Sequence, residues 1–148
     1  MRGRALVTGG TSGIGLAFAR ALAARGCDIT LVARDEARLA STAEELSSSG
    51  RVDVVTLPAD LSKAAGVAKV CSYIDGEAIE ILVNNAGKGL HHSLATTDTY
   101  PLREAIDLMG AAVVEVGGVA AAAMKARGHG VIINTASVSG LVPMGLYS

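Results

Sequence analysis

A glycine-rich segment near the start of the chain has the residue types and spacing of a phosphate-binding turn. It reads TGGTSGIG over residues 8–15 and joins the apolar run Ala5–Val7 to a helical pattern. Such a turn directs backbone N–H groups and the positive end of a helix dipole at one point, which suits a pyrophosphate. Gly9, Gly13 and Gly15 keep Cβ atoms away from the phosphates, and Thr11 and Ser12 add hydroxyl donors. The spacing G-x-x-x-G-x-G is a weak signal alone, because a turn that needs glycine for steric reasons would look the same.

A second candidate position follows the apolar run Ile29–Ala33, where Arg34 precedes Asp35. In α/β proteins that bind dinucleotides, an acidic residue here accepts a hydrogen bond from the 2′-hydroxyl of NAD, whereas an arginine neutralises the 2′-phosphate of NADP. Arg34 comes first after the run, so the sequence favours NADP(H). NAD(H) is the alternative if Asp35 faces the ribose, and the simplest other interpretation is an exposed Arg34 beside an Asp35 that only caps the next helix.

The elements that must position these residues alternate along the chain. Strand-like runs are expected at residues 5–8, 29–33, 52–57, 79–83 and 131–134. Helical periodicity runs from Ile14 to about Gly26, with Phe18, Ala21 and Leu22 also in the apolar stripe of this first helix. Three further helices are expected: from the Asp35 cap to Gly50, from a Ser62 cap to about Ile74, and from Glu104 to Arg127. This β-α repetition predicts a doubly wound parallel sheet of the Rossmann type, a three-layer α/β/α fold in a single domain over residues 1–148.

Composition narrows the class of protein. Of the 148 residues, 50% are hydrophobic and only 3% aromatic, so the core must consist of Ala, Val, Leu and Ile. A net charge of -1, without long runs of either sign, does not suit a nucleic-acid or anionic-membrane partner. Two cysteines fit a reduced compartment, no hydrophobic segment suits a signal peptide, and residues 109–124 are short of the ~20 that a bilayer span needs. We expect a soluble cytoplasmic protein without a metal site, since His91 and His92 have no suitable partner ligands.

Four ordered motifs together resemble the short-chain dehydrogenase/reductase family. They are TGGTSGIG, Ala59-Asp60-Leu61 after the third run, Asn84-Asn85-Ala86-Gly87 directly after ILV, and IINTASVSG over residues 132–140. The resemblance implies that Gly9, Thr11, Ser12, Gly13, Ile14 and Gly15 hold the pyrophosphate. It further implies that Asp60 and Leu61 lie by the adenine, and that Asn85, Ala86 and Gly87 line the ribose and nicotinamide end. Asn84 could instead only tie neighbouring strands together, and Lys88 reads as a surface lysine.

The catalytic residues that the resemblance implies are Ser137, which orients the substrate oxygen, and Tyr147, the general acid/base. A phenol of pKa ~10 needs a nearby cation to exchange protons near neutrality. Three features depart from the family pattern. The sequence ends at Ser148, before the Lys expected four residues after Tyr147; Tyr147 follows Ser137 more closely than usual; and Met109 stands where a helix Asn is expected, with Asp107 nearby.

The sequence therefore predicts the cofactor-binding portion of an NADP(H)-preferring oxidoreductase, C-terminally truncated, that moves a hydride between nicotinamide and a carbonyl or secondary alcohol. A non-catalytic NADP-binding module, or an inactive fragment, is the alternative. A methyltransferase would also use a glycine-rich first turn, but the NNAG motif and the downstream Ser and Tyr argue against it. We expect apolar surface on the 104–127 helix to form a homo-oligomer. The substrate and the direction of reaction are not readable from these residues.

Overall fold

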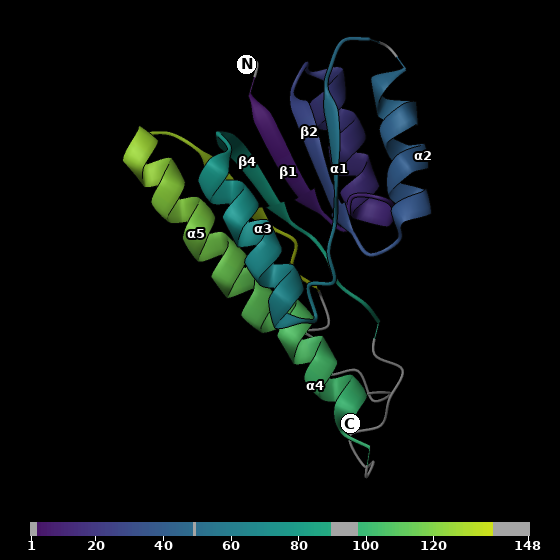
Figure 1. Ribbon diagram of the computed structural model, residues 1–148, viewed down its shortest axis with the longest axis vertical. Coiled ribbons are helices and arrows are strands. Elements are labelled where there is room, and N and C mark those ends of the chain that lie inside the picture. Colours follow the sequence, from purple (N-terminus) through teal and green to yellow (C-terminus); the bar gives the residue numbers. More distant parts are fainter. Residues whose placement is uncertain (1–2, 49, 90–97, 138–148) are drawn as a thin grey trace.

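The chain folds around a parallel sheet of five strands in the order β3-β2-β1-β4-β5 (Figure 1). The computed structural model describes residues 3–48, 50–89 and 98–137. The strands are β1 (Arg4–Thr8), β2 (Asp28–Ala33), β3 (Val54–Pro58), β4 (Ile79–Asn84) and β5 (Val131–Asn134). The helices are α1 (Gly13–Ala24), α2 (Glu36–Ser47), α3 (Ala64–Gly76), α4 (Tyr100–Ile106) and α5 (Ala112–Arg127), and a π-helical turn, η1 (Asp107–Ala111), joins the last two. The predicted doubly wound Rossmann-type sheet is confirmed.

Helices cover both faces of this sheet, so that the fold has three layers and two apolar cores. Figure 1 shows α3 and α5 on one side and α1 and α2 on the other. The first core joins Leu6 and Leu82 of the sheet to Val70 of α3 and Val116 of α5. The second core lies under α1 and α2 and includes Leu31. Because both faces are covered, β1 and β2 are buried along nearly their whole length, as the continuous apolar runs predict.

Several predicted boundaries and faces were wrong for local reasons. Pro58 is the last residue of β3 and pairs with Ala33, whereas the predicted strand ended at residue 57. A proline is tolerated at this position because β3 is an edge strand. Ser62 does not cap α3; its hydroxyl donates to Asp60 instead. Ile14, placed in the apolar stripe of α1, is 60% exposed. Ala21 of that stripe is exposed as well, whereas Phe18 and Leu22 pack against the second core beside the buried Gly15 and Ala19.

The long C-terminal helix begins at Tyr100, four residues before the predicted start, with Pro101 in its first turn, where a missing N–H costs nothing. One face packs on α3 and the sheet, whereas Ile106 and Val114 are exposed. By length and composition, the stretch Tyr100–Arg127 could cross a membrane: it has 28 residues, and 22% of its most apolar window is buried. A core helix of a globular protein passes the same test, so this is weak support for a span.

Candidate nucleotide-binding site

A hollow of about 190 Å³ opens at the carboxyl ends of the central strands. In open α/β sheets this is the edge at which ligands bind. The loops after β1, β2, β3 and β4 all contribute to the hollow, together with Leu108 of η1. The residues that line it include these candidates from the sequence: Gly9, Thr11, Ser12, Arg34, Asp60, Leu61, Ala86 and Gly87. The other candidates near it, Gly13, Ile14, Gly15 and Asn85, do not line it.

The glycine-rich turn is packed so tightly that two of its positions exclude a side chain. Gly9 has φ 65°, and a Cβ there would lie 3.0 Å from the Cα of Ala86. A Cβ on Gly15 would collide with the carbonyl oxygen of Gly9 and with the side-chain amide of Asn85. Ser12 is the N-cap of α1, but its side chain makes no capping hydrogen bond. The Ser12 hydroxyl therefore does not accept a hydrogen bond from the backbone N–H groups in the first turn of that helix. These amides and the absence of Cβ atoms suit a phosphate group.

Thr8 holds the loop after β4 against the end of β1, a role that the sequence analysis missed. Its Oγ1 accepts hydrogen bonds from the backbone N–H of Asn85 (2.9 Å) and of Ala86 (3.0 Å). The same hydroxyl donates to the carbonyl of Val83 at 3.3 Å. Asn85 completes the junction, because its Nδ2 donates to the carbonyl oxygen of Thr8 at 3.1 Å. The Asn85 side chain therefore fastens the glycine turn rather than pointing into the hollow.

Two arginines and a helix cap form the wall after β2. Asp35 is the N-cap of α2, where its Oδ1 accepts from the Arg38 backbone N–H at 3.0 Å. The Arg38 guanidinium lies 3.7 Å from Asp35 Oδ2. Arg34 and Arg38 both line the hollow, and both are exposed. Arg38 was missed by the sequence analysis, although an arginine in the first turn of the helix that follows Arg34 was a usable signal.

Asp60, on the wall after β3, has a well-defined ionised carboxylate. Partial burial opposes its ionisation, whereas the Ser62 hydroxyl (2.7 Å) and backbone N–H (3.0 Å) donate hydrogen bonds that favour the ionised form. The positive charges of Arg34 and Lys63 add to the effect, so the pKa of Asp60 lies below its ordinary value. A fixed carboxylate at this edge can accept hydrogen bonds from an exocyclic amine or a ring N–H.

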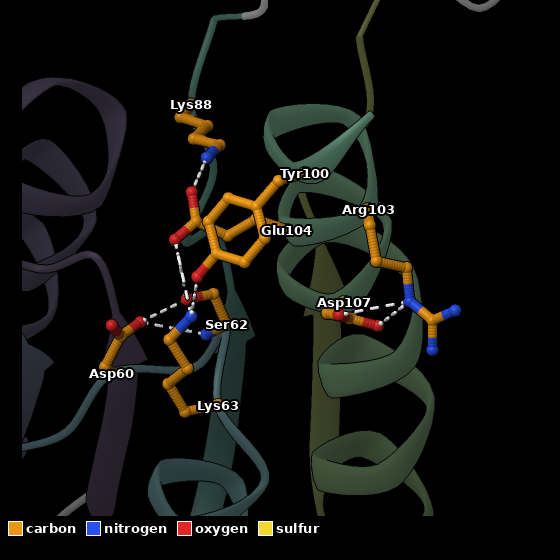
Figure 2. A network of polar contacts seen from close by, with 8 residues as sticks. All are labelled: Asp60, Ser62, Lys63, Lys88, Tyr100, Arg103, Glu104 and Asp107. Atoms are coloured by element: carbon orange, nitrogen blue, oxygen red, sulfur yellow. Dashed lines mark hydrogen bonds and ion pairs between the residues drawn. The ribbon is translucent and has the colours of Figure 1, made fainter. Parts of the chain in front are cut away.

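The end of β4 serves two purposes, one structural and one at the hollow. Asn84 is buried, and its Nδ2 donates to Asn134 Oδ1 at 3.0 Å, so it ties β4 to β5 as the structural alternative foresaw. Gly87 lies beside Met109, since a Cβ there would be 3.5 Å from the Met109 sulfur. The carboxylate of Asp107, the residue near Met109, pairs with Arg103 at 3.1 Å (Figure 2).

Two further predictions concern the loops next to the strands. Lys88 was read as a surface lysine, and this was wrong: its side chain is 27% exposed and forms an ion pair with Glu104 (Figure 2). Ser137 lies in an exposed position after the carboxyl end of β5. Tyr147, His91 and His92 lie outside the described residues. Within residues 3–48, 50–89 and 98–137, no group of three or more metal-ligating side chains occurs.

A parallel sheet in this order, with a glycine turn and a hollow at the carboxyl ends of its strands, defines the Rossmann-type class of nucleotide-binding folds. The short chain dehydrogenase family model matches residues 4–148, and the chain belongs to this family. A very-long-chain 3-oxoacyl-CoA reductase of Danio rerio is 32% identical over 147 residues, which cover 96% of this chain and 47% of that protein.

Solved structures agree in fold. A short-chain dehydrogenase from Sphingobium yanoikuyae in complex with NADPH superposes with a TM-score of 0.92 at 34% identity, covering 97% of this chain and 58% of that one. L-sorbose reductase from Gluconobacter frateurii, complexed with NADPH and L-sorbose, gives a TM-score of 0.90 at 33% identity and covers 98% of this chain and 56% of that one. The chain spans about half the length of the curated relatives that it matches.

Proposed function

We propose that this chain is the NADP(H)-binding portion of an oxidoreductase that acts on a carbonyl or secondary alcohol. The observation that carries the proposal is the hollow at the carboxyl ends of the strands, lined by the glycine turn on one wall and by Arg34 and Arg38 on another. The family to which the chain belongs and the NADPH bound in two similar structures support the same proposal.

The described residues fit a dinucleotide. The first-turn amides of α1 and the Thr11 and Ser12 hydroxyls would hold the diphosphate, with Gly13 and Ile14 shaping the start of the helix. Arg34 and Arg38 would hold a 2′-phosphate, because Asp35 is already engaged as the cap of α2. The remaining contacts would come from the loops after β3 and β4, through Asp60, Leu61, Ala86 and Gly87, while Asn85 would hold the glycine turn in place.

A bound nicotinamide would supply the hydride-transfer chemistry. In this proposal Ser137 orients the substrate oxygen by a hydrogen bond, and the Tyr147 hydroxyl gives or takes the proton at that oxygen. Ser137 follows β5, whose carboxyl end lies beside that of β4. The two strands therefore bring Ser137 and the loop that contains Ala86 and Gly87 to the same edge of the sheet.

Calorimetric titration with NADPH, NADH and S-adenosylmethionine tests the cofactor proposal. We expect NADPH to bind most tightly, and Arg34→Ser and Arg38→Ser each to weaken NADPH about 10- to 100-fold, as expected for a lost charge-assisted hydrogen bond. NADH affinity should change little. Arg51→Ser, at an exposed arginine that does not line the hollow, is the matched control. Binding of S-adenosylmethionine alone, or equal NADPH affinity in all three variants, would refute the assignment.

A non-catalytic NADP-binding module is the second candidate, and Met109 favours it. A thioether beside Gly87 cannot hold a water or a backbone carbonyl as an amide would. NADPH binding without turnover of any of a panel of ketones and secondary alcohols would select this candidate. Restored turnover in a Met109→Asn variant would assign the loss to that side chain.

We further propose that copies of the chain associate through the exposed side of Tyr100–Arg127, in a soluble cytoplasmic protein. Ile106 is 64% and Val114 is 74% exposed on this helix. Gly118 and Ala122 are exposed there too, and such small residues permit close approach of a second helix. Light scattering tests the association, and cell fractionation tests the location.

A further inference from the structure

Glu104 lies at the centre of a polar cluster that joins three separate segments (Figure 2). Its carboxylate pairs with Lys88 of the loop after β4 and lies 3.7 Å from the ammonium of Lys63, which precedes α3. The Ser62 hydroxyl also lies 3.4 Å from Glu104 Oε1. The Glu104 side chain is only 21% exposed, so these partners replace much of its contact with water.

The loops that Glu104 joins are two walls of the hollow. Lys88 directly follows Gly87, and Ser62 and Lys63 directly follow Asp60 and Leu61. Asp60, Leu61 and Gly87 line the hollow, whereas Ser62, Lys63 and Lys88 do not. Ser62 is the link to Asp60, because its hydroxyl and N–H are the groups that fix the Asp60 carboxylate.

Tyr100 supports the same cluster from the start of α4. The Lys63 ammonium donates to the Tyr100 hydroxyl at 2.7 Å and lies 5.2 Å from the centre of its ring. One turn after Glu104, Leu108 reaches the hollow from η1. The helix therefore contacts the hollow directly through Leu108 and indirectly through Glu104.

The charges in the cluster favour an ionised Glu104. The hydrogen bond from Lys88 lowers the pKa of Glu104, partial desolvation opposes it, and the charges of Lys88 and Lys63 lower it further, against repulsion from Asp60. Near neutral pH the carboxylate is therefore ionised and offsets part of the positive charge of Lys63 and Lys88.

We propose that Glu104 is a positioning residue that holds the loops after β3 and β4 at the spacing that the adenosine half of NADP(H) requires. This inference rests on the proposed function. Glu104 does not itself line the hollow, so its effect on a ligand passes through Ser62 and Asp60 on one wall and through Lys88 and Gly87 on the other. Loss of the carboxylate charge should let the two walls separate while the sheet and its cores stay folded.

The test measures the affinity of the chain for NADPH and for adenosine 2′,5′-bisphosphate, which probes the adenosine half alone. We expect Glu104→Gln to weaken both about fivefold, the effect of losing a partly buried ion pair. Lys88→Met should weaken both affinities to a similar degree, whereas Lys88→Arg, which keeps the positive charge, should bind both ligands as the unaltered chain does. The double variant Glu104→Gln with Lys88→Met should lose no more affinity than either single variant. Rescue by arginine and non-additivity are outcomes that a general loss of stability would not produce.

Asp107→Asn is the matched control, because Asp107 is a carboxylate on the same helical stretch whose partner, Arg103, is 74% exposed and away from the hollow. Each variant is titrated only under conditions in which circular dichroism shows that it is folded. If Glu104→Gln does not fold, the comparison of Lys88→Met with Lys88→Arg tests the proposal. Unchanged affinity in Glu104→Gln or Lys88→Met, or an equal loss of affinity in Asp107→Asn, overturns the positioning role of Glu104 and leaves the proposed function standing. Absence of NADPH binding by the unaltered chain overturns the proposed function and this inference with it.

Discussion

Replacing Thr8 by valine tests how the glycine turn is held to the loop after β4. Valine has nearly the same shape, and Thr8 is only 2% exposed, so the change removes a hydroxyl without opening a cavity. The backbone N–H groups of Asn85 and Ala86 lose their acceptor, and the Val83 carbonyl loses a donor. Thr8→Ser keeps the hydroxyl and loses only a methyl group, which makes it the matched control.

The magnitude follows from how far those groups are buried. An unsatisfied buried N–H costs about 1–3 kcal/mol, and Asn85 and Ala86 are half-buried, so the low end of that range applies to each. The sum is about 2–3 kcal/mol for Thr8→Val, against about 1 kcal/mol for the methyl lost in Thr8→Ser. A loss of about 2 kcal/mol lowers the ratio of folded to unfolded chain about 30-fold.

Urea unfolding followed by circular dichroism measures this difference. With a slope of about 1–3 kcal/mol per molar urea, Thr8→Val should unfold about 1 M earlier than the unaltered chain and clearly before Thr8→Ser. NADPH affinity should fall in Thr8→Val as well, because the loop that carries Ala86 and Gly87 loses its anchor. If Thr8→Val were as stable as Thr8→Ser, the hydroxyl would not be what holds the loop, and the reasoning would be wrong.

Three further changes test other parts of the structure. Gly15→Ala should cost about 1–3 kcal/mol and lower the melting temperature, because the new methyl collides with the Gly9 carbonyl; Gly76→Ala, with open space around it, is the control, and equal melting curves for the two variants would contradict the close packing. The pKa of Glu104 lies below its ordinary 4.5, so its contribution to stability is complete above that pH and disappears as the pH falls through the lowered pKa. The unfolding free energy of Glu104→Gln should thus differ from that of the unaltered chain at pH 7 and converge with it in acid, and a difference independent of pH would speak against the ion pairs. Val114→Glu should reduce self-association in light scattering, whereas Arg51→Glu, a change at an exposed position outside this helix, should not; association unaffected by Val114→Glu would place the interface elsewhere.

The sequence predicted the sheet and the order of its elements because the apolar runs and the helical stripes carry that information directly. Leu39 and Leu46 of α2, and Val67, Val70 and Ile74 of α3, are buried at helical spacing within the ranges predicted for these helices. The exception was α1. There Phe18 and Leu22 of the predicted stripe pack against the core, but Ile14 and Ala21 are exposed, and the fully buried positions are the smaller Gly15 and Ala19, because the helix begins close to the glycine turn.

The site was only partly readable from the sequence. Residue types pointed to the glycine turn, to Arg34 and to Asp60, which lie around one hollow. The contacts of Thr8 and Glu104 join segments that are 77 and 16 residues apart in the sequence, and no local pattern indicates such pairings. The π-helical turn that directs Leu108 to the hollow was not predicted either, because no residue type marks one wider turn inside a continuous helix.

The strand order β3-β2-β1-β4-β5 has a consequence for the way this chain can assemble. The earliest strand in the sequence is the central one, and each later strand joins an outer border of the pairs already made. A polypeptide emerging from the ribosome can therefore build the sheet outward in both directions without undoing an earlier pairing. Backbone amides of Ala5–Val7, in the central strand that is paired with β2 on one side and β4 on the other, should be the last to exchange with deuterium.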